Sequence, residues 1–170
     1  MAWHLDPRLA PFIVVAEVER GDRFVRPLFA RKLGGIPPEF GHHLIAFHAR
    51  ADGSFIPAGY LHLWTQGTIG LVGGGCTDGH VIRAMPEEQR RLVNDAGGIL
   101  FQLLGFCFDR FEPGLEAYFG HCGDARAKEV DLRAGFRETS VRHLLVRPNK
   151  PLTPGRYEAL LAQAEAIGAF

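Results

Sequence analysis

An acidic and a histidine side chain lie close together just before the segment 81–85 and could supply acid–base chemistry. Asp78 and His80 stand just before it, and an imidazole can accept a proton near neutral pH. His121 follows a later apolar run in a glycine-containing turn and is a second candidate base. The alternative for both histidines is a structural role, with the ring bonded to backbone or water.

Anion binding is indicated by the segment 88–108, which opens polar, passes through small residues and ends in an apolar run. We expect a loop that leads into a buried helix, with Asn94 or Asp95 as its N-cap. Small residues at this point would leave the first amides of the helix uncovered, and such amides attract phosphates. Arg91 could add positive charge. The alternative is an ordinary buried helix whose small first residues allow close packing.

Metal and thiol chemistry are not indicated. The three cysteines form no CxxC pair, so we interpret them as reduced thiols of a cytoplasmic protein. His42 and His43 are adjacent and would point to opposite faces of a strand, and no histidine has the spacing of a metal ligand set. We therefore expect no metal. The run 73–75 of three glycines lacks the GK[ST] of a phosphate loop and is interpreted as a flexible turn.

The bulk composition is that of a globular domain. The 170 residues are 46% hydrophobic and 22% charged, with a formal net charge of zero. Nothing here favours a nucleic-acid or membrane partner. The longest apolar run, 99–108, is too short to span a bilayer, and the first residues do not resemble a secretory signal. We expect a cytoplasmic location.

The strands and helices predicted from the sequence must position the candidate acid–base and anion-binding residues. The pattern predicts a mixed sheet flanked by helices, which is an α/β class of fold. The central strand–helix–strand unit should be a parallel crossover, with the start of its helix at the edge of the sheet, where ligands commonly bind. Strands are expected at 11–19, 43–49, 55–65, 80–85, 115–119 and 142–147, helices at 22–33, 124–134 and 156–167 besides the central one, and a glycine-rich loop at 66–79.

One motif near the central helix resembles a known family. The pattern R/Q-x-x-G-x-G/A is matched by Arg91 and Ala96, with Asn94 at the middle glycine, and apolar residues follow. Asparagine tolerates unusual backbone angles better than most residues, so this loop could keep its shape.

A second motif lies downstream. The pattern N-x-x-A-x-x-x-Y-x-x-x-G-F is matched in spacing by Asp124, Ala127, Gly135 and Phe136, with Asp131 at the tyrosine. Together and in this order, the two motifs resemble those of the GCN5-related N-acetyltransferase (GNAT) superfamily. The resemblance covers roughly residues 11–147.

The resemblance implies a single GNAT-like (acyl-CoA N-acyltransferase) domain over 1–170, with a core at about 11–147 and a C-terminal strand, loop and helix at 148–170. It also implies acetyl-CoA as donor, with amides of the loop holding the pyrophosphate and backbone groups of the preceding strand holding the pantetheine arm. The residues so implicated are Arg91, Leu92, Val93, Asn94, Asp95, Ala96 and Gly97 in the loop, Val81, Ile82, Arg83, Ala84 and Met85 in the strand, and Asp124 and Ala127 in the second motif.

Acyl transfer to an amine needs a base for the amine and an acid for the leaving thiolate. His80, beside Asp78, or His121 could be the base. In the family the acid is often the tyrosine that Asp131 replaces, and Asp131 could donate a proton only if burial raised its pKa strongly. The alternative is a solvated Asp131 and no general acid.

We therefore expect an acetyl-CoA-dependent N-acetyltransferase that acts on a primary amine of a small molecule or peptide. Two alternatives remain: a GNAT-fold binding or structural protein without transferase activity, and an acyltransferase that uses another acyl-CoA. Catalysis would come mostly from positioning. The chain is rich in phenylalanine, and some of these side chains could form the face of a homodimer.

Overall fold

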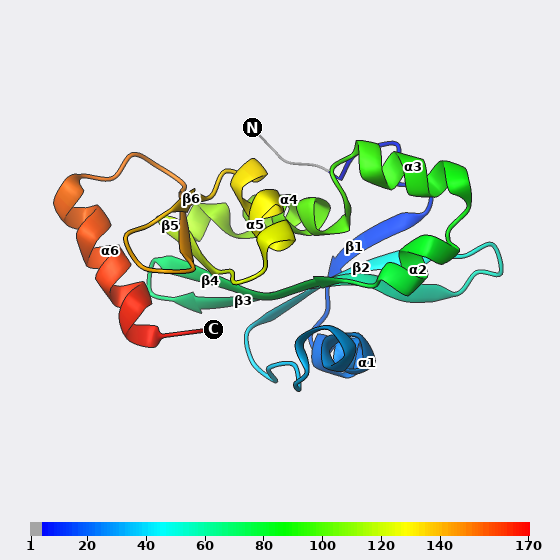
Figure 1. Cartoon of the computed structure of the whole chain (residues 1–170), viewed down its shortest axis with the longest axis horizontal. Coiled ribbons are helices and arrows are strands. Elements are labelled where there is room, and N and C mark those ends of the chain that lie inside the picture. The colour runs from blue at the N-terminus through cyan, green and yellow to red at the C-terminus, as the bar shows by residue number, and fades with distance from the viewer. Residues whose placement is uncertain (1–4) are drawn as a thin grey trace.

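We describe residues 5–170 from a computed structural model, so residues 1–4 of the segment assessed for a secretory signal lie outside the description (Figure 1). Seven strands form one sheet in the order β1-β2-β3-β4-β5-β7-β6. Only β4 and β5 pair in parallel, and all other neighbours are antiparallel. The strands are β1 (Ile13–Glu17), β2 (His42–Ala49), β3 (Phe55–Gln66), β4 (Ile69–Thr77), β5 (Ala117–His121), β6 (Arg137–Glu138) and β7 (Leu144–Pro148).

Helices cover both faces of this sheet. In Figure 1, α3, α4 and α5 lie above the sheet, α1 lies below it, α6 stands at its left-hand end, and α2 follows the end of β4. The helices are α1 (Gly21–Leu33), α2 (Gly79–Ala84), α3 (Glu87–Asp95), α4 (Ile99–Phe111), α5 (Ala125–Arg133) and α6 (Pro154–Ile167), and a 3-10 turn, η1 (Glu112–Gly114), follows α4. The predicted α/β fold with a mixed central sheet and flanking helices is therefore confirmed.

Alternating apolar residues of the strands pack on both layers of helices. On the α4 side, Phe108 packs on Tyr118 of β5 with ring centroids 4.9 Å apart. On the other face, α6 packs on β4, β5 and β7, and α1 packs on the buried Tyr60 of β3. Within residues 5–170 no helix combines the length and apolarity needed to cross a bilayer.

The glycine-rich segment expected as a loop is mostly strand β4. Its glycines allow close packing: a Cβ on Gly70 would lie 2.7 Å from Cδ1 of Tyr118. Glycine here removes a steric conflict, so a composition typical of turns belongs to a central strand. The interpretation of 73–75 as a flexible turn was wrong for the same reason, since these residues lie inside β4.

The strand expected at 80–85 is the helix α2. Asp78 is its N-cap, and the carboxylate accepts hydrogen bonds from the amides of His80 (2.9 Å) and Val81 (3.3 Å). A capping aspartate directly before the segment starts a helical turn in a sequence that otherwise suits a strand. The prediction of a strand that includes Val81–Met85 was wrong.

The segment 88–108 is two helices with a tight turn between them. The loop expected through Asn94 and Asp95 is the last turn of α3, so neither residue is the N-cap of the next helix. That N-cap is Gly98, and Gly97 and Gly98 have φ of 93° and 91°. Glycine adopts this left-handed backbone readily, which allows the chain to reverse within two residues.

Candidate active site

A cavity of about 460 Å³ opens where β4 and β5 separate. The parallel pairing runs from Ile69↔Ala117 to Val72↔Gly120 and then stops, although β4 continues to Thr77. Within residues 5–170, the side of β4 that faced β5 therefore has no strand partner beyond this point. The cavity is lined by Gly75, Cys76 and Thr77 of β4, Asn94, Gly97, Gly98, Ile99 and Leu100 around the start of α4, Asp124, Arg126, Ala127 and Val130 of α5, and Lys32, Leu33, Ile82 and Val93.

The first turn of α4 lines this cavity, and no side chain caps it. The turn before it is fixed by backbone bonds from the amide of Gly97 to the carbonyl of Asn94 (3.0 Å) and from that of Gly98 to Val93 (2.9 Å). Uncapped amides at the positive end of a thirteen-residue helix can bind an anion. The predicted anion site therefore has a structural counterpart, three residues or so further along the chain than the caps that were expected.

Cations from other elements stand around this helix start. Lys32 of α1 and Arg126 of α5 line the cavity. Arg133 of α5 lies against the turn, because a Cβ on Gly97 would be 2.9 Å from its Nη2. The Arg133 guanidinium also stacks on Phe101 at 5.1 Å. None of these three cations was singled out from the sequence, since they come from two helices that only the fold brings to α4.

The predicted donor-binding residues divide into two groups. Ile82, Val93, Asn94, Gly97, Asp124 and Ala127 line the cavity, whereas Val81, Arg83, Ala84, Met85, Arg91, Leu92, Asp95 and Ala96 do not. Val81 and Met85 are buried in the core instead. The strand backbone at the cavity belongs to Gly75–Thr77 of β4, because the residues after it turn into α2.

Asp78 and His80 occupy structural positions. Asp78 is buried, caps α2 and forms an ion pair with Arg31 at 2.6 Å. His80 is exposed on α2, and its Nδ1 lies 3.2 Å from Nη2 of Arg83. Neither side chain is among the residues that line the cavity.

His121 lies where the two strands part. It is the last residue of β5 and follows Gly120, the last residue paired with β4. Its ring is 6.2 Å from that of Phe170, and the Phe170 carbonyl lies against Gly73, where a Cβ would be 2.6 Å from that oxygen. The structure therefore puts His121 at the opening between β4 and β5, exposed and beside the chain segment that covers Gly73. Like His80, it is not among the residues that line the cavity.

Asp131 is half-buried on α5 rather than solvated. Burial raises the pKa of Asp131 to about 6, and a hydrogen bond with the Cys122 thiol partly offsets this increase. Burial also raises the pKa of Cys122 to about 11, so the thiol stays protonated at neutral pH. Asp131 faces Cys122 and is not among the residues that line the cavity, although Ala127 and Val130 of the same helix are.

No three His, Cys, Asp or Glu side chains among residues 5–170 come together in the way a metal ion would need. Cys76 and Cys107 are buried free thiols, and Cys122 is a half-buried one. Burial raises the pKa of Cys76 to about 11, which removes its thiolate at neutral pH although the residue borders the cavity. The cavity can therefore supply amides, cations and a strand edge, and no activated thiol.

No family model and no curated protein matches the chain. Two solved structures are similar to it in fold. One is described as "The crystal structure of KacTA-DNA complex", with 12% identity over 89% of this chain and 99% of that one and a TM-score of 0.46. The other is an acyl-CoA N-acyltransferase from Pseudomonas aeruginosa, with 14% identity over 79% of this chain and 98% of that one and a TM-score of 0.42.

Proposed function

We propose that the chain is an acyl-CoA-dependent N-acyltransferase, with acetyl-CoA as the donor and a primary amine as the acceptor. The observation that carries the proposal is the uncapped first turn of α4, which opens into the cavity beside the unpaired end of β4. An extended molecule with a phosphate end and an amide-containing arm fits this combination of features. The helix start could bind the phosphate end, and the free edge of β4 could bind the amide-containing arm.

The phosphate end would lie at the start of α4. Its amides and the dipole of the helix favour negative charge. Arg133 supplies a cation at the turn before α4, and Arg126 and Lys32 supply cations in the lining of the cavity. Gly97 lets the Arg133 guanidinium come close to the backbone before α4, because a Cβ at this position would lie 2.9 Å from its Nη2. These residues fit a pyrophosphate.

The arm would lie along Gly75–Thr77. These residues pair with β3 on one side only, through Tyr60↔Cys76 and Gly59↔Thr77, and the cavity is on the other side. A strand with a free edge can exchange backbone hydrogen bonds with an amide-containing ligand, as it does with an added strand. A backbone amide at this edge would also stabilise negative charge on the thioester oxygen during attack.

His121 would accept the proton of the attacking amine. An imidazole can do so near neutral pH, and this histidine lies at the opening through which an acceptor would reach the end of β4. The bond from the amine nitrogen to the acyl carbon forms, the carbon–sulfur bond breaks, and the departing thiolate takes a proton from water. The main contribution of the site would be to hold amine and thioester together.

A second candidate function is coenzyme A binding without transfer. It is favoured by Asp131, which stands where the family has its tyrosine and is engaged with Cys122. A longer acyl donor is the remaining variant of the leading proposal. A cytoplasmic location, an acceptor that is a small molecule or peptide, and the absence of a nucleic-acid partner also stay predictions.

The test is thermal unfolding of the purified protein with and without coenzyme A and acetyl-CoA. A ligand at 100 times its Kd stabilises by about 2.7 kcal/mol, which gives a clear melting shift. We expect a shift with both ligands that is reduced in Arg126→Gln and kept in Arg142→Gln, an exposed arginine that does not line the cavity. No shift at millimolar ligand would overturn the proposal.

A screen of primary amines then separates the candidates. Release of free thiol from acetyl-CoA with any amine supports the transferase. Tight coenzyme A binding with no release from acetyl-CoA or longer acyl-CoAs would favour the binding protein, and release from longer acyl-CoAs alone would identify a different donor.

A further inference from the structure

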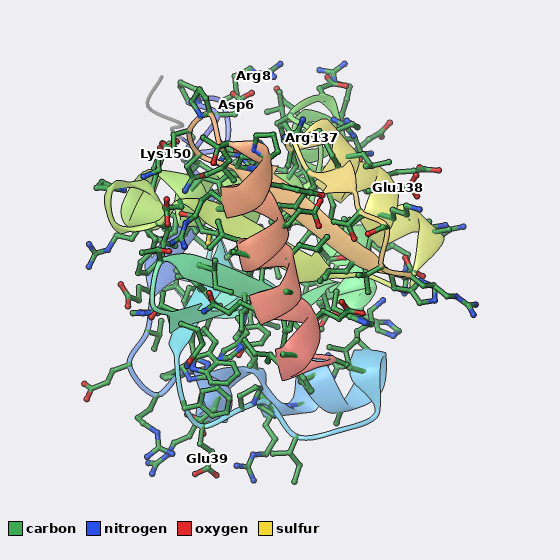
Figure 2. All side chains as sticks on the ribbon, turned by 90° about the vertical axis from the view of Figure 1, so that its left-hand side faces the viewer. Asp6, Arg8, Glu39, Arg137, Glu138 and Lys150 are labelled. Atoms are coloured by element: carbon green, nitrogen blue, oxygen red, sulfur yellow. The ribbon has the colours of Figure 1, made fainter. Side chains whose placement is uncertain are left out.

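Only three of the 19 lysine and arginine residues of the chain are lysines, and two of the three are paired with carboxylates on the surface. Lys128 of α5 pairs with Glu138 of β6, and Lys150, in the loop before α6, pairs with Glu116 at 3.2 Å. Figure 2, which looks at the α6 side, shows Lys150 and Glu138 on either side of this helix. Lys32 of α1 is the remaining lysine, and within residues 5–170 its side chain has neither an ion pair nor a hydrogen bond.

The unpaired Lys32 is also the lysine that lines the cavity at the end of β4. Helix α1 lies directly on β4 here, because a Cβ on Gly74 would be 3.1 Å from Cε2 of Phe29. Lys32 follows Phe29 by three residues, so the two side chains lie on the same face of α1, about one turn apart. Burial raises the pKa of Cys76 to about 11, and the positive charge of Lys32 opposes this increase. Lys32 therefore lies near the strand edge 75–77, along which the acyl-CoA arm is proposed to bind.

Lys32 reaches the cavity from the face of the sheet opposite the proposed phosphate site. In Figure 1, α1 lies below the sheet, whereas α4 and α5 lie above it. Arg126 and Arg133 belong to α5 and thus to the α4 side. A donor with its phosphates at the start of α4 and its arm along the edge of β4 would place its thioester between the two layers. The amine of Lys32 can then approach the thioester from the side that the phosphates do not occupy.

We propose that Lys32 is a self-acylation site, to which the chain transfers the acyl group of its own bound acyl-CoA. The inference rests on the proposed function, because it uses the same donor in the same cavity. The bond from Nζ to the acyl carbon forms and the carbon–sulfur bond breaks. The ammonium group gives up two protons to solvent, one before the attack and one after it, and the departing thiolate takes one proton from water. A neutral amide then replaces a cation of the cavity, which weakens the binding of the anionic donor.

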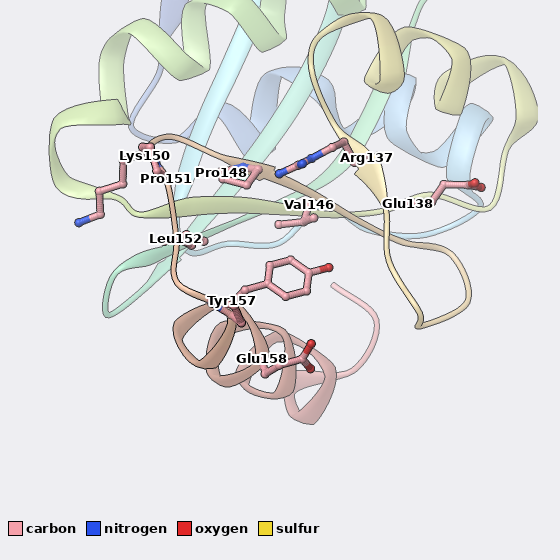
Figure 3. A pocket seen from close by; sticks show the side chains of 10 residues that line it. Arg137, Glu138, Val146, Pro148, Lys150, Pro151, Leu152, Tyr157 and Glu158 are labelled. Atoms are coloured by element: carbon pink, nitrogen blue, oxygen red, sulfur yellow. The ribbon is translucent and has the colours of Figure 1, made fainter.

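Lys150 provides a control for acylation by free acyl-CoA in solution. Its side chain is 58% exposed, so a dissolved thioester can reach it. It lines a different pocket of about 410 Å³, between the β6–β7 edge and α6 (Figure 3), which shares no lining residue with the cavity at α4. Uncatalysed acylation would therefore modify Lys150 as well, whereas transfer from the bound donor would be confined to Lys32.

Mass spectrometry of the full chain after incubation with acetyl-CoA tests the proposal. We expect one acetyl group per chain, and digestion into peptides should assign it to Lys32. Its rate constant at saturating donor should not change when the protein is diluted, because donor and acceptor belong to one complex. Lys32 should react at least about tenfold faster than Lys150, since a bound donor is held at a high effective concentration. Equal rates at the two lysines would overturn the proposal.

Two matched substitutions assign the site. Lys32→Arg keeps the charge and should abolish the modification, whereas Lys150→Arg should retain it. A melting shift with coenzyme A in each variant shows that the variant is folded and binds the donor. The parent acetylated at Lys32 should bind coenzyme A roughly threefold more weakly than the unmodified parent, as expected for loss of one exposed charge. Equal affinities would contradict the proposed effect on the donor.

The self-acylation and the proposed function fail in different ways. A melting shift with coenzyme A and thiol release with an added amine, together with an unmodified Lys32, would overturn self-acylation and leave the proposed function intact. Neither a melting shift nor an acetyl group would overturn both.

Discussion

The guanidinium of Arg133 lies against Gly97, so that a Cβ on this glycine would be 2.9 Å from Nη2 of the arginine. Gly97 lies in the turn between α3 and α4, Arg133 is the last residue of α5, and their contact brings a cation to the turn before the uncapped start of α4. The same Cβ would be 2.7 Å from Cδ1 of Phe101. The absence of a side chain at Gly97 therefore allows both the backbone conformation of the turn and the close packing of Phe101 and Arg133 on it.

We expect Gly97→Ala to lower the free energy of unfolding by about 2 kcal/mol, because it combines a left-handed backbone with two close contacts. Gly98→Ala is the matched control, since Gly98 has a similar φ of 91° but nothing within 4 Å of a Cβ. It should cost about 1 kcal/mol from the backbone alone. Denaturant unfolding measures both values, and equal losses would show that the contacts at Gly97 do not matter.

We expect Arg133→Gln to weaken coenzyme A binding by about tenfold, as loss of one ionic hydrogen bond to a phosphate would. The affinity of the parent should fall with added salt, and that of the variant should fall less steeply. Titration calorimetry at two salt concentrations gives both quantities. Arg110→Gln, an exposed arginine at the far end of α4, should leave them unchanged, and an equal effect there would point to general charge rather than to this contact.

The stability of the protein should depend on the ionisation of Asp131. Because the pKa of Asp131 is raised to about 6 from 3.8, the folded state binds more protons than the unfolded state between these values. The free energy of unfolding should therefore decrease as pH rises from about 4 to about 6, where this carboxyl loses its proton. After solvent screening of a half-buried group the contribution is about 1 kcal/mol.

Asp131→Asn removes this ionisation and keeps an acceptor for the Cys122 thiol. The variant should be more stable than the parent at pH 7, by about the same 1 kcal/mol, and the difference should vanish near pH 4. Urea unfolding at a series of pH values makes the comparison. A difference in stability that does not change with pH would mean that the Asp131 carboxyl does not titrate between about pH 4 and pH 7.

His121→Gln and His80→Gln distinguish the two candidate bases. With the best amine found, His121→Gln should lower turnover by about 100-fold, a common loss on removal of a general base, and should leave coenzyme A affinity intact. His80→Gln should change neither quantity, since this side chain lies beside Arg83 on α2 and not where β4 and β5 stop pairing. Turnover at different pH values gives a further check, because the ionisation assigned to the base should disappear with His121. The reverse pattern would return the role to His80.

Sequence reasoning expected the start of a buried helix in the segment 88–108 and misplaced the residues at that start. Small residues at 96–98 do precede an apolar helix, yet the cap was expected at Asn94 or Asp95 and is Gly98. A polar stretch such as 87–95 suits an exposed helix as well as a loop, because one buried residue, Val93, is enough to attach it to the core. By contrast, the helix expected from Asp124 is present as α5, and Asp124 caps it, since its side chain accepts a bond from the amide of Ala127 at 2.8 Å. Caps with a side-chain bond are local and can be recognised in the sequence.

The sequence by itself determined the class of the fold and the order of most of its elements, because periodicity and caps act between near neighbours. Only the tertiary structure decided that β4 is a strand, since its glycines are explained by the packing of Tyr118 from β5 on Gly70. Only the tertiary structure brought Lys32 and Arg126 to the cavity and Arg133 to the turn before α4. These contacts join residues that are distant in the chain. They meet around the place where β4 and β5 stop pairing, and no local sequence pattern encodes where that pairing ends.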